Sequence, residues 1–157
     1  MESDLRHTFF FKYVFLLISV MSGITGIISY FVPELVVVNG EPSNFDLSDY
    51  ALTAIFIVLG LILHLLTSHL FIRVRLDGQN INLIYKEEEE EAISWLNVDS
   101  VNKIPFLFPP LYKLRFKDKS GLLLFTTKPE YIQFGFGTAD LSEMGNFIEK
   151  KKREFGI

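Results

Sequence analysis

The order of apolar and polar positions divides the chain into two regions of different character. Residues 9–32 and 50–72 are largely apolar runs whose only acidic or basic side chains are Lys12 and two histidines. Each is long enough to cross a bilayer core of roughly 30 Å at about 1.5 Å per helical residue. After residue 72 apolar and polar positions alternate in period two, which is typical of half-buried strands. The pattern predicts a transmembrane helical hairpin over residues 1–72 and a β-rich domain over 73–157, with no linker between them.

The first apolar run is predicted to be a retained helix rather than a cleaved signal peptide. It is longer than the roughly 7–15 residues of a signal core, and no A-x-A-like cleavage site follows it. Lys12, one turn in, can extend its ammonium group to the headgroups. Pro33 is expected to end the helix, and Asp46 or Ser48 can cap the second one.

Small residues recur at spacings of three and four along one face of the first predicted helix: Ser19, Ser22, Gly23, Gly26 and Ser29. Lipid gives helices no hydrophobic reason to associate, so small residues that let backbones approach favour packing there. This face can pack on the second helix of the same chain, through Ala54, Gly60 and Thr67, or on another subunit.

Charge at the ends of the two runs predicts their orientation. The connection between them carries acidic but no basic residues, and the basic residues lie on the other side, at Arg6, Lys12, Arg73 and Arg75. The positive-inside rule then places both termini in the cytoplasm. The net charge of −4 gives no global basicity of the kind that nucleic-acid binding favours, so no nucleic-acid partner is expected.

The second region is predicted to hold seven short strands and then one amphipathic helix. Asp77-Gly78 and Asp118 to Gly121 are turn signals between strands. The predicted strands are 71–76, 80–86, 92–97, 101–104, 111–117, 122–127 and 131–136. Asp140 to Glu143 forms a D-x-x-E capping box at the start of the helix. An α+β fold follows, in which a barrel-like antiparallel sheet is closed at one end by the C-terminal helix.

This order of elements resembles the bacterial pleckstrin-homology-like (PH-like) small membrane proteins. The resemblance rests on FIRVRLDGQNINLIY (71–85), AISWLNVDSV (92–101), LYKLRFKDKSGLLLFTT (111–127) and LSEMGNFIEKKK (141–152). It implies a seven-stranded PH-like barrel with a capping helix, a non-enzymatic role, and a place in the bacterial inner (cytoplasmic) membrane. Phosphoinositide-binding members carry several basic residues around the first strand pair. Here only Arg73 and Arg75 lie near that loop, so headgroup binding there is not expected.

Enzymatic chemistry is not expected. The absence of cysteine excludes disulfides, thiol catalysis and zinc-thiolate sites. The chain has no G-x-S-x-G, H-E-x-x-H or phosphate-loop motif. His64 lies within the second apolar run, where a polar group is a functional candidate or a neutral imidazole bonded to a Ser or Thr of the first helix. His64 and His69 are five residues apart and face different directions on a helix. We therefore expect neither a cofactor nor a metal site.

Three stretches of the second region are candidate interaction sites. Lys113, Arg115 and Lys117 share one strand face, which either meets anionic lipid or is simply solvated. Phe106, Leu107 and Phe108 lie between prolines and either form a surface for the membrane interface or a partner, or fold into the core. The run Glu87 to Glu91 is expected to be a solvated loop, with binding of a cation or a basic partner as the alternative.

These patterns favour a membrane-anchored interaction or scaffold module that presents a cytoplasmic PH-like domain to a protein partner. One alternative is a sensor of anionic lipid at the membrane surface, using the basic strand and the aromatic loop. Another is a small accessory subunit of a larger membrane transporter or enzyme complex, packed through the Ser19 to Ser29 face. In each case the bilayer is a partner, together with a membrane protein or a second copy of the chain.

Overall fold

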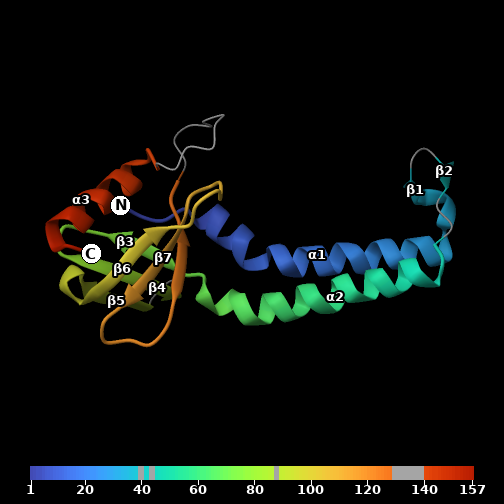
Figure 1. Cartoon of the computed structure of the whole chain (residues 1–157), viewed down its shortest axis with the longest axis horizontal. Coiled ribbons are helices and arrows are strands. Elements are labelled where there is room, and N and C mark those ends of the chain that lie inside the picture. Colours follow the sequence, from blue (N-terminus) through green and yellow to red (C-terminus); the bar gives the residue numbers. More distant parts are fainter. Residues whose placement is uncertain (39–40, 43–44, 87–88, 129–139) are drawn as a thin grey trace. The chain divides into compact units, whose positions relative to one another are not determined.

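The computed structural model describes residues 1–38, 41–42, 45–86, 89–128 and 140–157. These residues form two compact units (Figure 1). The helical unit comprises Phe11–His69, and the β unit comprises Met1–Phe10 together with Leu70–Ile157.

Two long apolar helices packed together make up most of the helical unit, as the sequence predicts. Helix α1 spans Leu5–Phe31, and α2 spans Leu47–Thr67 and continues into the 3-10 turn η2, Ser68–Leu70. Both are long and apolar enough to cross a membrane. Helix α1 starts four residues before the apolar run, because the Asp4 carboxylate accepts the backbone N–H of His7 at 3.0 Å.

The described part of the connection between the helices contains a 3-10 turn and a pair of short strands. Pro33 ends α1 as expected and opens the 3-10 turn η1, Pro33–Leu35. The short strands β1, Val37–Val38, and β2, Glu41–Pro42, then pair antiparallel. Asp46 caps α2 in a reciprocal capping box with Asp49.

The described strands of the β unit form two open three-stranded antiparallel sheets. Their bounds are β3 Arg73–Leu76, β4 Asn80–Lys86, β5 Glu89–Ser94, β6 Val98–Lys103, β7 Leu111–Phe116 and β8 Leu123–Thr126. Within the described residues the order is β3-β4-β5 in one sheet and β6-β7-β8 in the other, and no barrel is formed. The chain passes between the sheets through the 3-10 turn η3, Trp95–Asn97, without a β5–β6 ladder. The seventh predicted strand, 131–136, lies outside the described residues.

The first residues of the chain lie along the free edge of β3. The backbone N–H of Ser3 donates to Val74 O at 2.8 Å, and that of Leu76 donates to Met1 O at 2.7 Å. The next amide, that of Asp4, donates to Thr126 O of β8 at 2.9 Å. Residues 1–4 thus cover one sheet edge and link the two sheets, which removes unpaired backbone groups from β3.

The core of the β unit surrounds Trp95, the only tryptophan of the chain, which is fully buried. Helix α3, Glu143–Phe155, supplies Met144 and Ile148 to this core and stacks Phe155 on Trp95 with ring centroids 6.4 Å apart. The indole N–H donates to Asp77 O at 3.1 Å, so the ring's single donor is satisfied.

The cap of α3 is Ser142 rather than the predicted Asp140 to Glu143 box. The Ser142 hydroxyl oxygen accepts the N–H of Gly145 at 2.9 Å, and the helix begins at Glu143. Asp140 lies two residues before this cap, and its carboxylate instead accepts the hydroxyls of Tyr112 at 3.0 Å and Thr127 at 2.7 Å. The sequence motif predicted a helix here, but the helix begins two residues later than the box implies and a different side chain caps it.

Candidate interaction surfaces

The outer face of β7 carries exposed basic side chains. Lys113 and Arg115 are exposed and alternate with the buried Tyr112, Leu114 and Phe116. In the described part of the chain neither Lys113 nor Arg115 has an ion pair. Lys117, just after the strand, donates from its ammonium group to Leu96 O at 2.9 Å. Of the three basic residues predicted to share this face, Lys117 is therefore bonded within the β unit. We call the other two, Lys113 and Arg115, the basic strip.

The arginines of the first hairpin are neutralised. Arg73 forms an ion pair with Glu2, and Arg75 lies 2.9 Å from Glu90 and 3.8 Å from Glu2. Glu2 reaches them because the first residues run along β3. These arginines are thus partners of carboxylates within the β unit rather than a site for an external anion.

The acidic run is not the solvated loop that its charge predicts, at least over the part described. Glu89, Glu90 and Glu91 lie in β5, paired with β4. Glu91 forms an ion pair with Lys119, and the hydrogen bond from Lys119 holds the pKa of Glu91 below its usual range. Strand pairing and neighbouring cations overcome the mutual repulsion that argued for an open loop.

The aromatic loop between β6 and β7 is exposed at its tip and fixed at its base. Phe106 is 79% exposed and Phe108 is 59% exposed, whereas Pro109 and Pro110 are buried. Below the tip the N–H of Ile104 donates to Leu111 O at 2.7 Å. Of the two alternatives left open by the sequence, the structure has Phe106, Leu107 and Phe108 on the surface and not in the core.

The small-residue face of α1 packs on α2. Ser19 is buried and donates from its hydroxyl to Ile57 O at 3.1 Å. A Cβ added at Gly60 would lie 2.3 Å from Ser19 Oγ, so only glycine permits this approach. Farther along, Gly26 faces Thr53 at 3.2 Å from an ideal Cβ, and the hydroxyls of Ser29 and Tyr50 lie 3.5 Å apart. Gly23 is in ordinary contact with Ile57, and Ser22 is half-buried.

His64 bonds to the backbone of α1. Its Nδ1 lies 3.1 Å from Lys12 O, so this nitrogen carries the proton and donates to the carbonyl. The imidazole also lies 5.6 Å from the ring of Tyr13, measured between centroids. The partner is a carbonyl and not the Ser or Thr hydroxyl that the sequence suggested. This bond satisfies one nitrogen of a polar ring in an apolar helix.

A shallow groove of about 330 Å³ opens on the helical unit. Its walls come from both helices and are almost entirely apolar, with Gly23, Gly26, Tyr30, Tyr50 and Thr53 among them. The described residues contain no cluster of three or more His, Asp or Glu side chains that could hold a metal ion.

The cluster of Asp140, Tyr112 and Thr127 is a structural feature that the sequence patterns did not suggest. Tyr112 and Thr127 are almost fully buried, and both hydroxyls donate to the same Asp140 oxygen. Burial, followed by the charge of Asp140, raises the pKa of Tyr112 well above its usual range. The phenol therefore stays neutral and acts as a donor, which ties the segment before α3 to the sheet β6-β7-β8.

Comparison with known proteins gives no family. No family model, curated protein or solved structure matches the chain.

Proposed function

We propose that this chain is a non-enzymatic, membrane-anchored interaction module whose β unit lies on the cytoplasmic side and binds a protein partner. The two helices hold the β unit at the membrane. Both termini are cytoplasmic in this proposal, because Arg6, Lys12 and Arg73 lie at one end of the apolar segments and the acidic connection lies at the other.

The proposal includes a PH-like arrangement of the β unit. Six described strands in two antiparallel sheets, followed by a C-terminal helix that contributes to their core, agree with that order of elements. Arg73 and Arg75 are paired with carboxylates, so the proposal assigns the binding surface to a part of the β unit other than the first hairpin.

The basic strip is the observation that carries the proposal. Lys113 and Arg115 are exposed cations without an ion pair in the described part of the chain. Arg115 lies about 13 Å along β7 from Leu111, at about 3.3 Å per residue. Leu111 is near the end of the sheet where β8 meets residues 4 and 72 of the connections to the helices. Lys113 pairs with Leu124, whose carbonyl accepts the N–H of Ile72, so the strip begins at the level of this connection and Arg115 lies about 7 Å farther along β7. Two exposed cations without an ion pair in the described residues attract an acidic protein surface, which is the partner proposed here.

Site-specific crosslinking tests this proposal. A photoreactive amino acid at Lys113 in the full chain, expressed in its native membrane, should crosslink one companion protein. In a chain with Arg115→Glu the crosslink should be lost, because charge reversal on the strip repels an acidic surface. The matched control is Lys150→Glu, an exposed lysine on α3 that should leave the crosslink intact.

Two outcomes would contradict it. Crosslinks to lipid alone would favour the anionic-lipid sensor. A companion that is retained in the Arg115→Glu chain and crosslinks instead from the lipid-facing positions of α1 or α2 would favour an accessory subunit held through its helices.

A further inference from the structure

The tip of the β6–β7 loop exposes an uncharged cluster of aromatic and aliphatic side chains. Phe106 and Phe108 are mostly exposed, and Leu107 is 38% exposed. No charged residue occurs between Lys103 and Leu111. Phe106 is also the only non-glycine residue with positive φ in the described part of the chain, at 63°. A bulky side chain rarely adopts that backbone conformation, so the loop holds an exposed aromatic ring in an unfavourable geometry.

The loop lies at the end of the β unit from which the chain continues into both helices. The N–H of Thr127 donates to Pro110 O at 3.2 Å, which places the end of β8 beside the base of the loop. At that same end the Thr8 and Thr126 hydroxyls lie 2.8 Å apart, and the N–H of Ile72 donates to Leu124 O at 2.9 Å. The first turns of α1 and the residues after α2 thus leave the β unit near the loop.

The side chains around the tip match a membrane interface. Aromatic and aliphatic residues enter the boundary between headgroups and acyl chains, and lysines beside them meet lipid phosphates. The exposed Lys128 follows Thr127 beside the base of the loop. No carboxylate lies between Lys103 and Lys113 to repel an anionic leaflet. Because two helices already hold the chain in the membrane, a contact of low intrinsic affinity is sufficient at the high effective concentration.

We propose that Phe106, Leu107 and Phe108 insert into the interface of the cytoplasmic leaflet and hold the β unit against the membrane. The proposal rests on the membrane insertion of α1 and α2 stated above and not on the protein partner of the basic strip. The loop is a third point of attachment besides the two helix connections. It holds this end of the β unit at the membrane surface.

Fluorescence quenching in the full chain tests the proposal. The chain has no cysteine, so a single cysteine can carry an environment-sensitive nitrobenzoxadiazole label at any chosen site. Three variants are compared in vesicles of phosphatidylcholine, with and without phosphatidylglycerol: Phe106→Cys in the loop, Leu96→Cys at the other end of β6, and Val58→Cys in α2. Leu96 is 65% exposed and Val58 is 56% exposed. A nitroxide on the lipid acyl chain is the quencher.

The label at residue 106 should be blue-shifted and quenched several-fold more than the label at residue 96, in both lipid mixtures. If the blue shift and the quenching persist in vesicles of phosphatidylcholine alone, the loop is held by apolar insertion and not by electrostatic attraction alone. Buried Trp95 reports folding of each labelled chain through its emission, and Phe108→Cys is the second variant if Phe106→Cys does not fold.

Quenching at residue 58 without quenching at 106 or 108 overturns the proposal. A blue shift at 106 without acyl-chain quenching also overturns it, because the occupant is then protein, such as a second copy of the chain. No quenching at residue 58 overturns the membrane insertion on which the proposal rests, so the two failures are distinguishable.

Discussion

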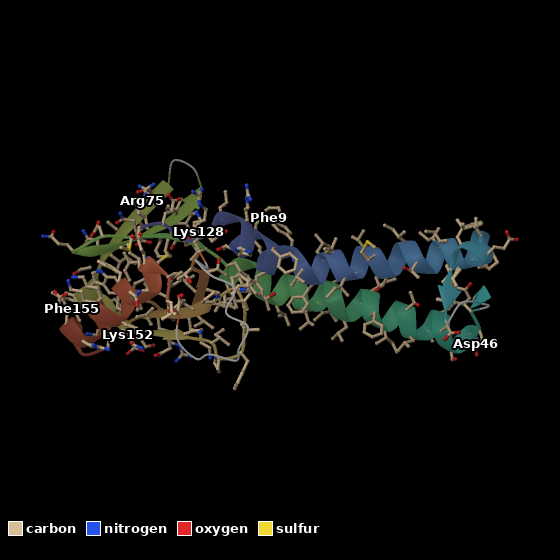
Figure 2. The ribbon with its side chains drawn as sticks, turned by 90° about the horizontal axis from the view of Figure 1, so that it is seen from above. Phe9, Asp46, Arg75, Lys128, Lys152 and Phe155 are labelled. Atoms are coloured by element: carbon tan, nitrogen blue, oxygen red, sulfur yellow. The ribbon has the colours of Figure 1, made fainter. Side chains whose placement is uncertain are left out.

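The helical unit and the β unit place opposite kinds of side chain inside. In the β unit the large apolar residues Trp95, Leu114 and Ile148 are fully buried. In the helical unit the buried residues are small or polar, such as Gly60 and Ser19, while Leu65 is 73% exposed. Figure 2 shows side chains projecting outward along both long helices. Only 11% and 6% of the most apolar windows of the two helices are buried. The hydrophobic effect favours burial of large apolar side chains in the β unit. The exposed leucines of the helical unit are compatible with surrounding lipid, whose acyl chains are as apolar as leucine.

The two units also satisfy their polar groups differently. In the helical unit Ser19 and His64 bond to backbone carbonyls of the opposite helix, so each polar side chain brings the backbones together. In the β unit the Asp140 carboxylate accepts hydrogen bonds from the hydroxyls of Tyr112 and Thr127. The first kind of contact depends on close approach through small residues, and the second on a carboxylate held beside a water-excluding core. Matched substitutions in the two units can separate these requirements.

The same truncation should have very different effects in the two units. Leu114→Ala removes a fully buried side chain and should destabilise the β unit by about 2–5 kcal/mol, whereas Leu65→Ala should leave its unfolding transition unchanged. Urea titration of the full chain in detergent, followed through Trp95 emission, measures both. An equal shift of the midpoint for the two variants would contradict the comparison.

A charge introduced at an exposed leucine should have the larger effect in the helical unit and the smaller effect in the β unit. Leu59→Asp, near the middle of α2, should weaken membrane insertion by about 2.5–3.5 kcal/mol. Leu96→Asp in η3 should be tolerated, since its side chain is 65% exposed to water. The measurement is the fraction of each chain that stays in membranes after alkaline carbonate extraction. Full retention of Leu59→Asp would show that this face of α2 does not meet lipid.

Adding one methyl group to a glycine gives a smaller contrast. Gly60→Ala places its Cβ 2.3 Å from Ser19 Oγ and 2.9 Å from Phe15 O, which should cost about 1–3 kcal/mol of helix packing. Gly78→Ala meets no atom within 4 Å and should be close to neutral. Loss of helical circular dichroism during SDS titration measures the first, and Trp95 emission in urea measures the second. A neutral Gly60→Ala would place the helices farther apart than described.

The smallest expected effect is on the stability of the β unit at acidic pH. The backbone N–H groups of Asn80 and Gln79 donate to the Asp77 carboxylate and lower its pKa from the ordinary value of 3.8. A carboxyl with a lowered folded pKa stabilises the fold above its unfolded pKa, and this contribution is lost as pH falls through the folded value. Below about pH 4 the natural chain should therefore lose stability more steeply than Asp77→Asn. Identical slopes of urea midpoint against pH would refute this role of the first hairpin turn.

Local periodicity of apolar and polar positions made much of the fold predictable. The two apolar helices, the first hairpin at Asp77-Gly78 and the C-terminal helix follow from local patterns. What could not be predicted depends on contacts between distant residues. Residues 1–3 pair with β3 through their backbones, which leaves no mark in the hydrophobic pattern. Glu89 to Glu91 look like a loop by charge, and only the positions of Arg75 and Lys119 show how a strand tolerates them.

The candidate sites divide in the same way. The alternation on β7 predicted that Lys113 and Arg115 point outward, but not that Lys117 would bond to the Leu96 carbonyl. The exposure of Phe106 to Phe108 was left open by the sequence, because an uncharged aromatic segment can fill a core or a surface equally well. The Asp140 cluster could not be predicted from the sequence, because its prediction depends on which strands lie beside the segment before α3.

The central claim is that two helices cross the membrane and leave the β unit in the cytoplasm. Its most direct test is labelling of single cysteines in intact spheroplasts with a membrane-impermeant maleimide, since the natural chain has no cysteine. Glu34→Cys, in the exposed turn η1, should be labelled from outside, and Ser120→Cys, in the exposed turn before β8, should be labelled only after lysis. Labelling of Ser120→Cys in intact spheroplasts would contradict the account.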